Sequence, residues 1–230
     1  MPHSTHDAEV VVYTGPDEEF QGREIMFGYN TRGNTLTIVD MTDHNNPAII
    51  GADTYEDAAY THQGWLTEDQ THLFLDDEAD ERRGEWGGNT RTMTVRPSKG
   101  SFGTALPRSL TRGAFFCRQW DVSDLRNPRL VHEFYSTETV IDHNQYVVGD
   151  FVFQSNYCSG LQVLEIQDDF SLSRTGFYDN APDCDTTVFS GSWSNYPYFA
   201  SGNVVFTSIE RGLYVVDASA ATAKKAKGQK

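Results

Sequence analysis

A short phrase that recurs along the chain constrains its fold more than any other feature. Each copy is an alternating, β-branched strand that ends at an acidic residue and leads into a polar turn. The four copies lie at residues 36–40, 119–124, 160–165 and 212–217. Their acids, Asp40, Asp121, Glu165 and Asp217, are roughly 45–80 residues apart, and a four-stranded propeller blade needs about 40–50 residues. The repeat therefore predicts a chain of blades with an insertion in the long first interval.

The strands between these phrases divide the chain into four units. They are short, aromatic and β-branched at even spacing, which is typical of an all-β propeller with four-stranded antiparallel blades. The predicted blades cover residues 6–56, 60–136, 141–179 and 188–217. The second holds an inserted loop at residues 82–113, and loops that long are usually functional or disordered. Residues 218–230, rich in Ala and Lys, are predicted to form a disordered tail, with a short frayed helix as the other interpretation.

The last predicted unit has no fourth strand. A propeller usually closes by completing one blade with a strand from the other terminus, and here the N-terminal segment already begins a blade. Either four blades close imperfectly, or the chain is part of a larger propeller. Exposed sheet edges favour association, so a homo-oligomer or a missing partner segment is expected.

The composition excludes some classes of function. The chain has 33 acidic and 18 basic residues, a formal net charge of −15, which argues against nucleic-acid binding because phosphates require a basic surface. The charge suits either divalent cations or simple solubility. No run approaches the ~18 apolar residues of a membrane helix, and residues 1–6 contain no apolar stretch of a secretory signal. A cytosolic protein, a mature chain and a fragment all agree with this.

The three cysteines, Cys117, Cys158 and Cys184, include no CxxC pair, so a structural zinc site is not predicted. Cys158 follows a predicted strand and Cys184 lies in a predicted loop. Two interpretations remain open: a Cys158–Cys184 disulfide, which implies an oxidising compartment, or two free thiols. Cys117 is left over in the first case.

Histidines open three of the four units, as His6-Asp7, His62-Gln63 and His143-Asn144. The first strand of each propeller blade lines the central channel, so equivalent positions converge near the axis. Three neutral imidazoles there suit a transition metal such as Zn or Fe. Asp7 and Asp142 are candidate partners or further ligands of the same site. The alternative is that these histidines only satisfy hydrogen bonds in the channel.

Other motifs give weaker signals. The acidic run at residues 76–81 offers oxygen ligands for Ca²⁺ but lacks the spacing of a known calcium loop, so a solvated loop is the competing interpretation. Trp65, Trp120 and Trp193 occupy repeat-related sites and are assigned to core packing rather than to sugar binding, whereas Trp86 is the candidate for an exposed aromatic contact. No GxSxG elbow, P-loop or dinucleotide fingerprint occurs, and no catalytic residue is assigned.

Several longer phrases resemble the choice-of-anchor B proteins, whose domains are LVIVD-repeat β-propellers. The matching phrases lie at residues 60–69, 142–144, 154–157, 193–197, 201–203 and 209–213, and the resemblance covers roughly residues 6–92 and 119–216. It implies a propeller fold and an extracellular or cell-surface location, and it implies little about activity.

The chain departs from that family in three respects. Family members are typically longer, with further blades on the N-terminal side, so the chain resembles a family member truncated there. No anchor or sorting signal follows Asp217. Residues 93–118 interrupt a region where Thr92 would run almost directly into Trp120, as either a lineage-specific loop or a translated retained intron.

Two functional hypotheses follow from these patterns. The first is an extracellular or surface-associated propeller that acts as a binding or structural module for a protein or glycan partner. The second is a metalloprotein that binds its metal through His6, His62 and His143. A metal-dependent enzyme is one form of this hypothesis. A degenerate fragment without independent function is a third.

Overall fold

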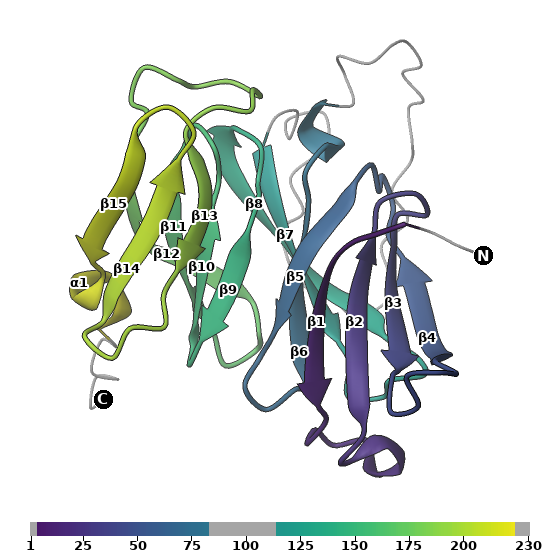
Figure 1. Cartoon of the computed structure of the whole chain (residues 1–230). Coiled ribbons are helices and arrows are strands. Elements are labelled where there is room, and N and C mark those ends of the chain that lie inside the picture. Colours follow the sequence, from purple (N-terminus) through teal and green to yellow (C-terminus); the bar gives the residue numbers. More distant parts are fainter. Residues whose placement is uncertain (1–3, 83–113, 224–230) are drawn as a thin grey trace.

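The computed structural model of the chain describes residues 4–82 and 114–223 (Figure 1). In that part of the chain fifteen strands form four antiparallel sheets, each taken from one continuous stretch of sequence. The first two sheets are β1 (Thr5–Val12), β2 (Glu24–Asn30), β3 (Thr35–Asp40) and β4 (Ala48–Thr54), then β5 (Thr61–Leu66), β6 (His72–Asp77), β7 (Ala114–Asp121) and β8 (Arg129–Thr139). The last two are β9 (Gln145–Val148), β10 (Phe151–Ser155), β11 (Leu161–Ile166) and β12 (Leu172–Tyr178), then β13 (Ser192–Tyr196), β14 (Asn203–Ser208) and β15 (Gly212–Asp217).

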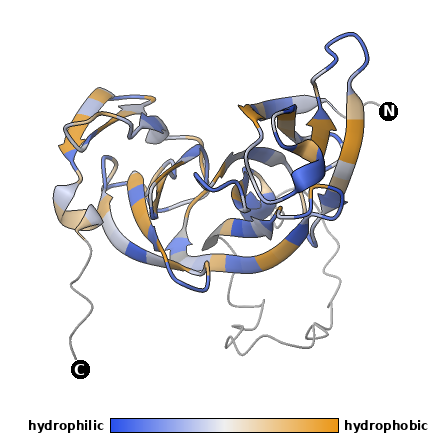
Figure 2. Ribbon diagram, turned by 90° about the horizontal axis from the view of Figure 1, so that it is seen from below, coloured by the Kyte–Doolittle hydropathy of each residue, from blue (hydrophilic) through white to orange (hydrophobic). Residues whose placement is uncertain are grey.

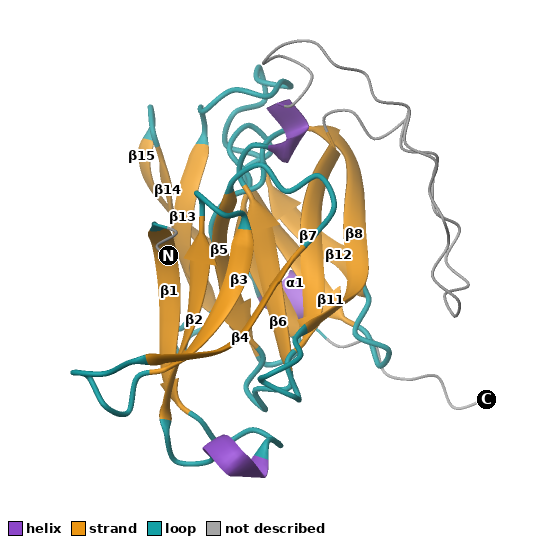
Figure 3. Ribbon diagram, turned by 90° about the vertical axis from the view of Figure 1, so that its right-hand side faces the viewer, coloured by secondary structure: helices purple, strands orange, loops and turns teal. Residues whose placement is uncertain are grey.

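Strands dominate the molecule, as Figure 3 shows. The described helical segments are the 3₁₀ turns η1 (Glu18–Phe20) and η2 (Asp80–Arg82) and the short α1 (Ser219–Thr222). The prediction of an all-β fold of four-stranded antiparallel sheets is confirmed, and in the described residues the fourth sheet has three strands.

The first strand of each sheet lies at the centre of the molecule. Strand β1 contacts β5, β5 contacts β9, and β9 contacts β13, although no pair of them shares a sheet. Figures 1 and 2 show the four sheets as an open arc around these inner strands, with the first and fourth sheets at its two ends. The inner strands thus bring equivalent positions of successive units close together.

The spaces between neighbouring sheets are filled by apolar side chains. Tyr29, Leu73 and Trp120 are fully buried between the first two sheets, and Phe206 is fully buried between the third and fourth. These positions follow from strand alternation, which sends every second side chain to the same face. Burial of each such large side chain contributes about 1.5–3 kcal/mol, so sheet-to-sheet packing holds the arc together.

The two ends of the arc expose apolar side chains. On the first sheet Val10 and Ile49 are 57% and 65% exposed, and on the fourth sheet Leu213 and Val215 are 64% and 62% exposed. Extended exposed apolar surface is typical of a contact site. The homo-oligomer expected from the sequence stays a prediction, and light scattering of the purified chain measures it.

The beginning of the predicted disordered tail is ordered. Ala218 is buried and Ala221 packs beside it against the core of the third and fourth sheets. The Asp217 carboxylate accepts a hydrogen bond from the Ser219 backbone N–H (2.9 Å), which starts the turn of α1. One buried and one half-buried alanine side chain therefore hold a segment that its composition assigned to disorder. Residues 224–230 lie outside the described part.

Gly51 in β4 lies close against the backbone of the second sheet. A Cβ atom built on Gly51 would lie 2.0 Å from the Leu125 carbonyl oxygen, in the turn between β7 and β8. We expect Gly51→Ala to lower the free energy of unfolding by about 1–3 kcal/mol, because backbone atoms of the two sheets must separate. Urea denaturation measures this.

Gly28→Ala in β2 is the matched control. Its Cβ would meet its nearest atom at 3.4 Å, so the change should leave stability equal or slightly raised. Equal denaturation midpoints for the two variants would show that the sheets do not pack as described.

Candidate metal centre

The structure brings the three predicted histidines together. His6 lies in β1, His62 lies in β5, and His143 lies in the segment just before β9. The ring centroid of His62 is 4.4 Å from that of His6 and 4.4 Å from that of His143. His62 and His143 are 3% and 1% exposed, whereas His6 is exposed. The site therefore has two interior imidazoles and a third on its solvent side.

Glu78 joins the two buried histidines. Its carboxylate oxygens lie 3.3 Å from His143 Nε2 and 3.8 Å from His62 Nε2. One donor atom from each of the three residues lies within 4.8 Å of the other two. Two imidazoles and one carboxylate are a ligand set that binds Zn²⁺ or Fe²⁺ and leaves coordination positions open.

The sequence interpretation missed Glu78 as a partner of the histidines and placed it in an acidic run. The signal was available in the hairpin of β5 and β6. Leu66 pairs with Leu73 and Thr61 pairs with Asp77, so the residue after β6 returns to the beginning of β5. The Glu78 backbone N–H donates to the Tyr60 carbonyl (3.1 Å), which fixes this return.

The ring orientation of His143 is set by the fourth sheet. Its Nδ1 bonds to the backbone carbonyl oxygen of Trp193, which can only accept. Nδ1 therefore carries a hydrogen, and Nε2 is the ring nitrogen that faces Glu78. A fixed hydrogen bond on the far nitrogen is how metal-binding histidines are usually oriented.

The surroundings of His62 differ from those of His143. Its Nδ1 lies 3.4 Å from Asp76 Oδ1 without a hydrogen bond between them, and its Nε2 faces Glu78. Burial lowers the pKa of His62, although Glu78, Asp7 and Asp77 act in the opposite direction. Burial likewise lowers the pKa of His6, helped by His62. Both effects favour the neutral imidazole, which is the form that binds a metal.

Glu78 is held as a carboxylate. Burial opposes its ionisation, but hydrogen bonding from His143 and Tyr157 and the charge of His62 keep its pKa below the ordinary value. The Tyr157 hydroxyl donates to Glu78 Oε1 (2.5 Å). The backbone of Tyr157 has φ +34°, a conformation that side-chain-bearing residues rarely adopt. Such strained residues gather at functional sites, which agrees with its role beside Glu78.

Tyr157 is anchored by a disulfide. Cys158, the next residue, is joined to Cys184 with an S–S distance of 2.02 Å. Cys117 is the free and buried thiol of the described chain, and its Sγ donates to Gln145 Oε1 (3.2 Å). The sequence left open a Cys158–Cys184 disulfide or two free thiols, and the structure contains the disulfide.

Asp7 and Asp142, the predicted partners of the histidines, lie in different surroundings. Asp7 is exposed, and its Oδ1 accepts a hydrogen bond from the Ala8 N–H (2.7 Å). Asp142 is fully buried, and its carboxylate groups with those of Asp80 and Glu81 instead of with the imidazoles. The assignment of Asp142 as a partner of the histidines is therefore replaced by membership in a buried carboxylate cluster.

The acidic run is not a solvated loop. Asp76 and Asp77 are fully buried at the end of β6, and Glu81 is 8% exposed. Asp77 accepts hydrogen bonds from the backbone N–H groups of Ala59 and Tyr60, each at 2.7 Å. Backbone donors thus take the place of water around the Asp77 carboxylate.

The tryptophans differ from one another. Trp120 is fully buried in the core, as expected from its repeat position. Trp193 was also assigned to the core but is 46% exposed, because its ring covers His143 at the surface with a centroid distance of 4.7 Å. Trp65 is half-buried. Trp86 lies outside the described residues, as does most of the inserted loop.

The comparisons with known proteins bear on the fold. No protein-family model matches the chain, and no curated protein sequence matches it. The chain is similar to the β-propeller domain of Myceliophteria thermophila Cps50 (Swd1), with a TM-score of 0.58 and 13% identity over 94% of this chain and 54% of that chain. It is also similar to Sqt1 of Saccharomyces cerevisiae, with a TM-score of 0.54 and 9% identity over 96% of this chain and 47% of that chain.

These neighbours show the class of fold: the chain is a β-propeller, as its repeat predicted. The chain spans about half the length of the solved structures it matches. None of the described helices is long and apolar enough to cross a membrane.

The carboxylate cluster predicts a pH dependence of stability. Burial raises the pKa of Glu81 well above its ordinary value, and Asp80 and Asp142 reinforce the shift. Burial also raises the pKa of Asp80, to about 6, against the effect of Arg118. A carboxyl with a raised folded pKa contributes stability that is full below its unfolded pKa and is lost as the pH rises through the folded value.

We therefore expect the wild type to lose more thermal stability between pH 5 and pH 8 than Glu81→Gln, both measured in chelator. Glu18→Gln, at an exposed position, is the control and should follow the wild type. The histidines are common to all three proteins, so their own titration cancels. Parallel curves for the wild type and Glu81→Gln would contradict this account.

Proposed function

We propose that the chain is a metal-binding β-propeller protein in which His62, His143 and Glu78 hold one transition-metal ion. The observation that carries the proposal is that both buried Nε2 atoms face the same carboxylate, at 3.3 and 3.8 Å. The other nitrogen of His143 bonds to the Trp193 carbonyl oxygen, and that of His62 lies 3.4 Å from Asp76 Oδ1. Such a second contact is needed to present a lone pair in a fixed direction.

The residues at the site determine how many coordination positions of a bound ion the protein fills. Two imidazoles and a carboxylate leave one or more coordination positions free, which is typical of sites with an exchangeable water or ligand. His6 lies on the solvent side of His62 and supplies a further imidazole near the entrance. Zn²⁺ and Fe²⁺ are the ions that this ligand set suits.

Metal content is the direct test. Protein purified without chelator or affinity histidines should contain about one transition-metal ion per chain by elemental mass spectrometry. His62→Ala and Glu78→Gln should lose it, because each removes one of three ligands. His44→Ala, at a side chain that is 72% exposed, is the matched control and should retain the metal.

Tyr157→Phe gives a finer measurement. The variant keeps the ring and removes only the hydroxyl bonded to Glu78, so we expect Zn²⁺ affinity to fall about 10–100-fold in a competition titration. A folded wild type that neither carries nor takes up a metal ion would refute the proposal.

A second function, binding of a protein or glycan partner, is favoured by exposed aromatic side chains near the fourth sheet. Phe189, Tyr196, Tyr198 and Phe199 are 46%, 50%, 39% and 48% exposed. Aromatic side chains supply much of the binding energy of interfaces. Crosslinking followed by mass spectrometry would identify a partner on this surface.

An extracellular or cell-surface location is part of this second proposal. The disulfide supports it, since such bonds persist in oxidising compartments. The resemblance to choice-of-anchor B proteins supports it as well and rests on the quoted phrases alone.

A further inference from the structure

A surface pocket lies at the other end of the inner strands. The histidines lie at the beginning of β1 and β5, whereas a pocket of about 230 Å³ lies beside the ends of these strands. The residues that shape it are Glu9, Trp65, Leu66, Glu68, Val147 and Tyr198. Glu9 follows His6, and Trp65 follows His62, by three residues, which is roughly 10 Å along a strand. The pocket is thus separate from the metal centre.

Aromatic rings form one side of the pocket. Trp65 and Tyr198 line it, with ring centroids 6.4 Å apart. Tyr146 packs behind them, 4.9 Å from Trp65 and 6.2 Å from Tyr198. Tyr198 is 39% exposed, so the aromatic side of the pocket is accessible from solvent.

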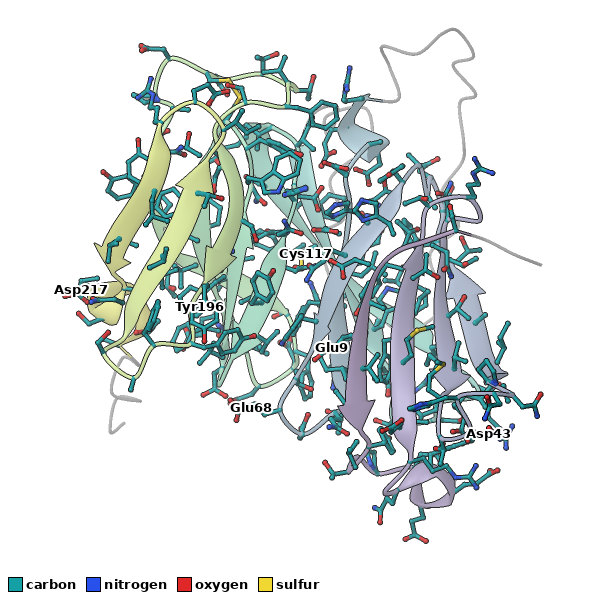
Figure 4. The ribbon with its side chains drawn as sticks, viewed as in Figure 1. Glu9, Asp43, Glu68, Cys117, Tyr196 and Asp217 are labelled. Carbon is teal, nitrogen blue, oxygen red and sulfur yellow. A yellow bond between two sulfur atoms is a disulfide. The ribbon has the colours of Figure 1, made fainter. Side chains whose placement is uncertain are left out.

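Two carboxylates stand beside these rings. Glu9 Oε2 accepts a hydrogen bond from the Leu66 N–H (2.8 Å), and Glu68 Oε1 accepts one from the Gly149 N–H (3.0 Å). The charges of both raise the pKa of Tyr198, in addition to the effect of burial, so both lie near that ring. Figure 4 labels Glu9 and Glu68, which lie on the same side of the buried Cys117. None of the described residues that line the pocket is Lys, Arg or His.

We infer that this pocket binds a quaternary ammonium group. The faces of Trp and Tyr attract a cation that is weakly hydrated, and recognition of choline or methylated lysine uses this combination. The carboxylates add attraction for positive charge and exclude anions. A volume of about 230 Å³ is below the roughly 300–1,000 Å³ of sites for drug-sized ligands, so it fits a single head group.

The rest of the molecule agrees with a cationic ligand. The net charge of −15 attracts cations over a distance and raises their local concentration. Burial raises the pKa of Glu9 to about 7, so a bound cation would favour its ionised form. An unmethylated ammonium is more strongly hydrated and needs hydrogen-bond acceptors around it.

The test is a calorimetric titration of the full chain with choline and with 3,3-dimethylbutan-1-ol, its uncharged isostere. We expect choline to bind at least tenfold more tightly than the isostere. Equal affinities would mean that the pocket recognises only an apolar shape, and no binding of choline would also overturn the inference. A second titration, with a peptide that carries trimethyllysine, distinguishes a protein ligand from a small molecule by which probe binds more tightly.

Matched variants assign the binding to this pocket. Tyr198→Leu and Glu9→Gln should each weaken choline binding at least tenfold. Tyr196→Leu is the control, because Tyr196 is 50% exposed, contacts Tyr198 and does not line the pocket. Circular dichroism checks that each variant folds, and Tyr198 is exposed enough for its loss to be tolerated. Choline binding that survives both pocket substitutions would place the site elsewhere and refute the inference.

Discussion

The arrangement of the sheets depends on single side chains that join one inner strand to the next. Gln63 of β5 donates to the carbonyl oxygen of Gln145 (2.9 Å) and accepts from its N–H (3.0 Å), so one amide replaces a pair of ladder bonds between the second and third sheets. Glu9 performs a similar function between β1 and β5. Asn195 joins β13 to the third sheet through the carbonyl oxygen of Phe153 (3.2 Å) and the hydroxyl of Ser155 (3.1 Å). Apolar packing brings the sheets together, and these bonds set their register at the axis.

Both candidate sites use that register. The Gln63–Gln145 pair holds the strand that carries His62 beside the segment that carries His143, and it thereby brings both rings near Glu78. At the opposite end, the bond from Leu66 to Glu9 holds a carboxylate beside Trp65. The two ends of one axis therefore have different chemistry, imidazole at one and aromatic rings with carboxylates at the other.

The sequence predicted what depends on repetition. The recurring strand phrase predicted the sheets, and the equivalence of inner strands predicted that His6, His62 and His143 would meet. Glu78 was missed because it stands in a run of acidic residues, and only the pairing of β5 with β6 brings it back to the beginning of β5. The burial of Asp76 and Asp77 was missed because their partners are backbone N–H groups, of Gln63 in β5 and of the turn before β5, which carry no signature in composition. The aromatic pocket was missed because Tyr198 comes from a loop and not from a repeat position.

The bond between His143 and the Trp193 carbonyl has a consequence for how such a protein evolves. The third unit supplies the ring and the fourth supplies the atom that aims it, while the second unit supplies His62 and Glu78. No single repeat contains the centre, so duplication of any one unit would add a blade without adding a site. Loss of the last unit would leave all three candidate ligands in place but remove the hydrogen bond that orients His143. The candidate site therefore passes to a descendant protein only if the second, third and fourth units are kept together in this order.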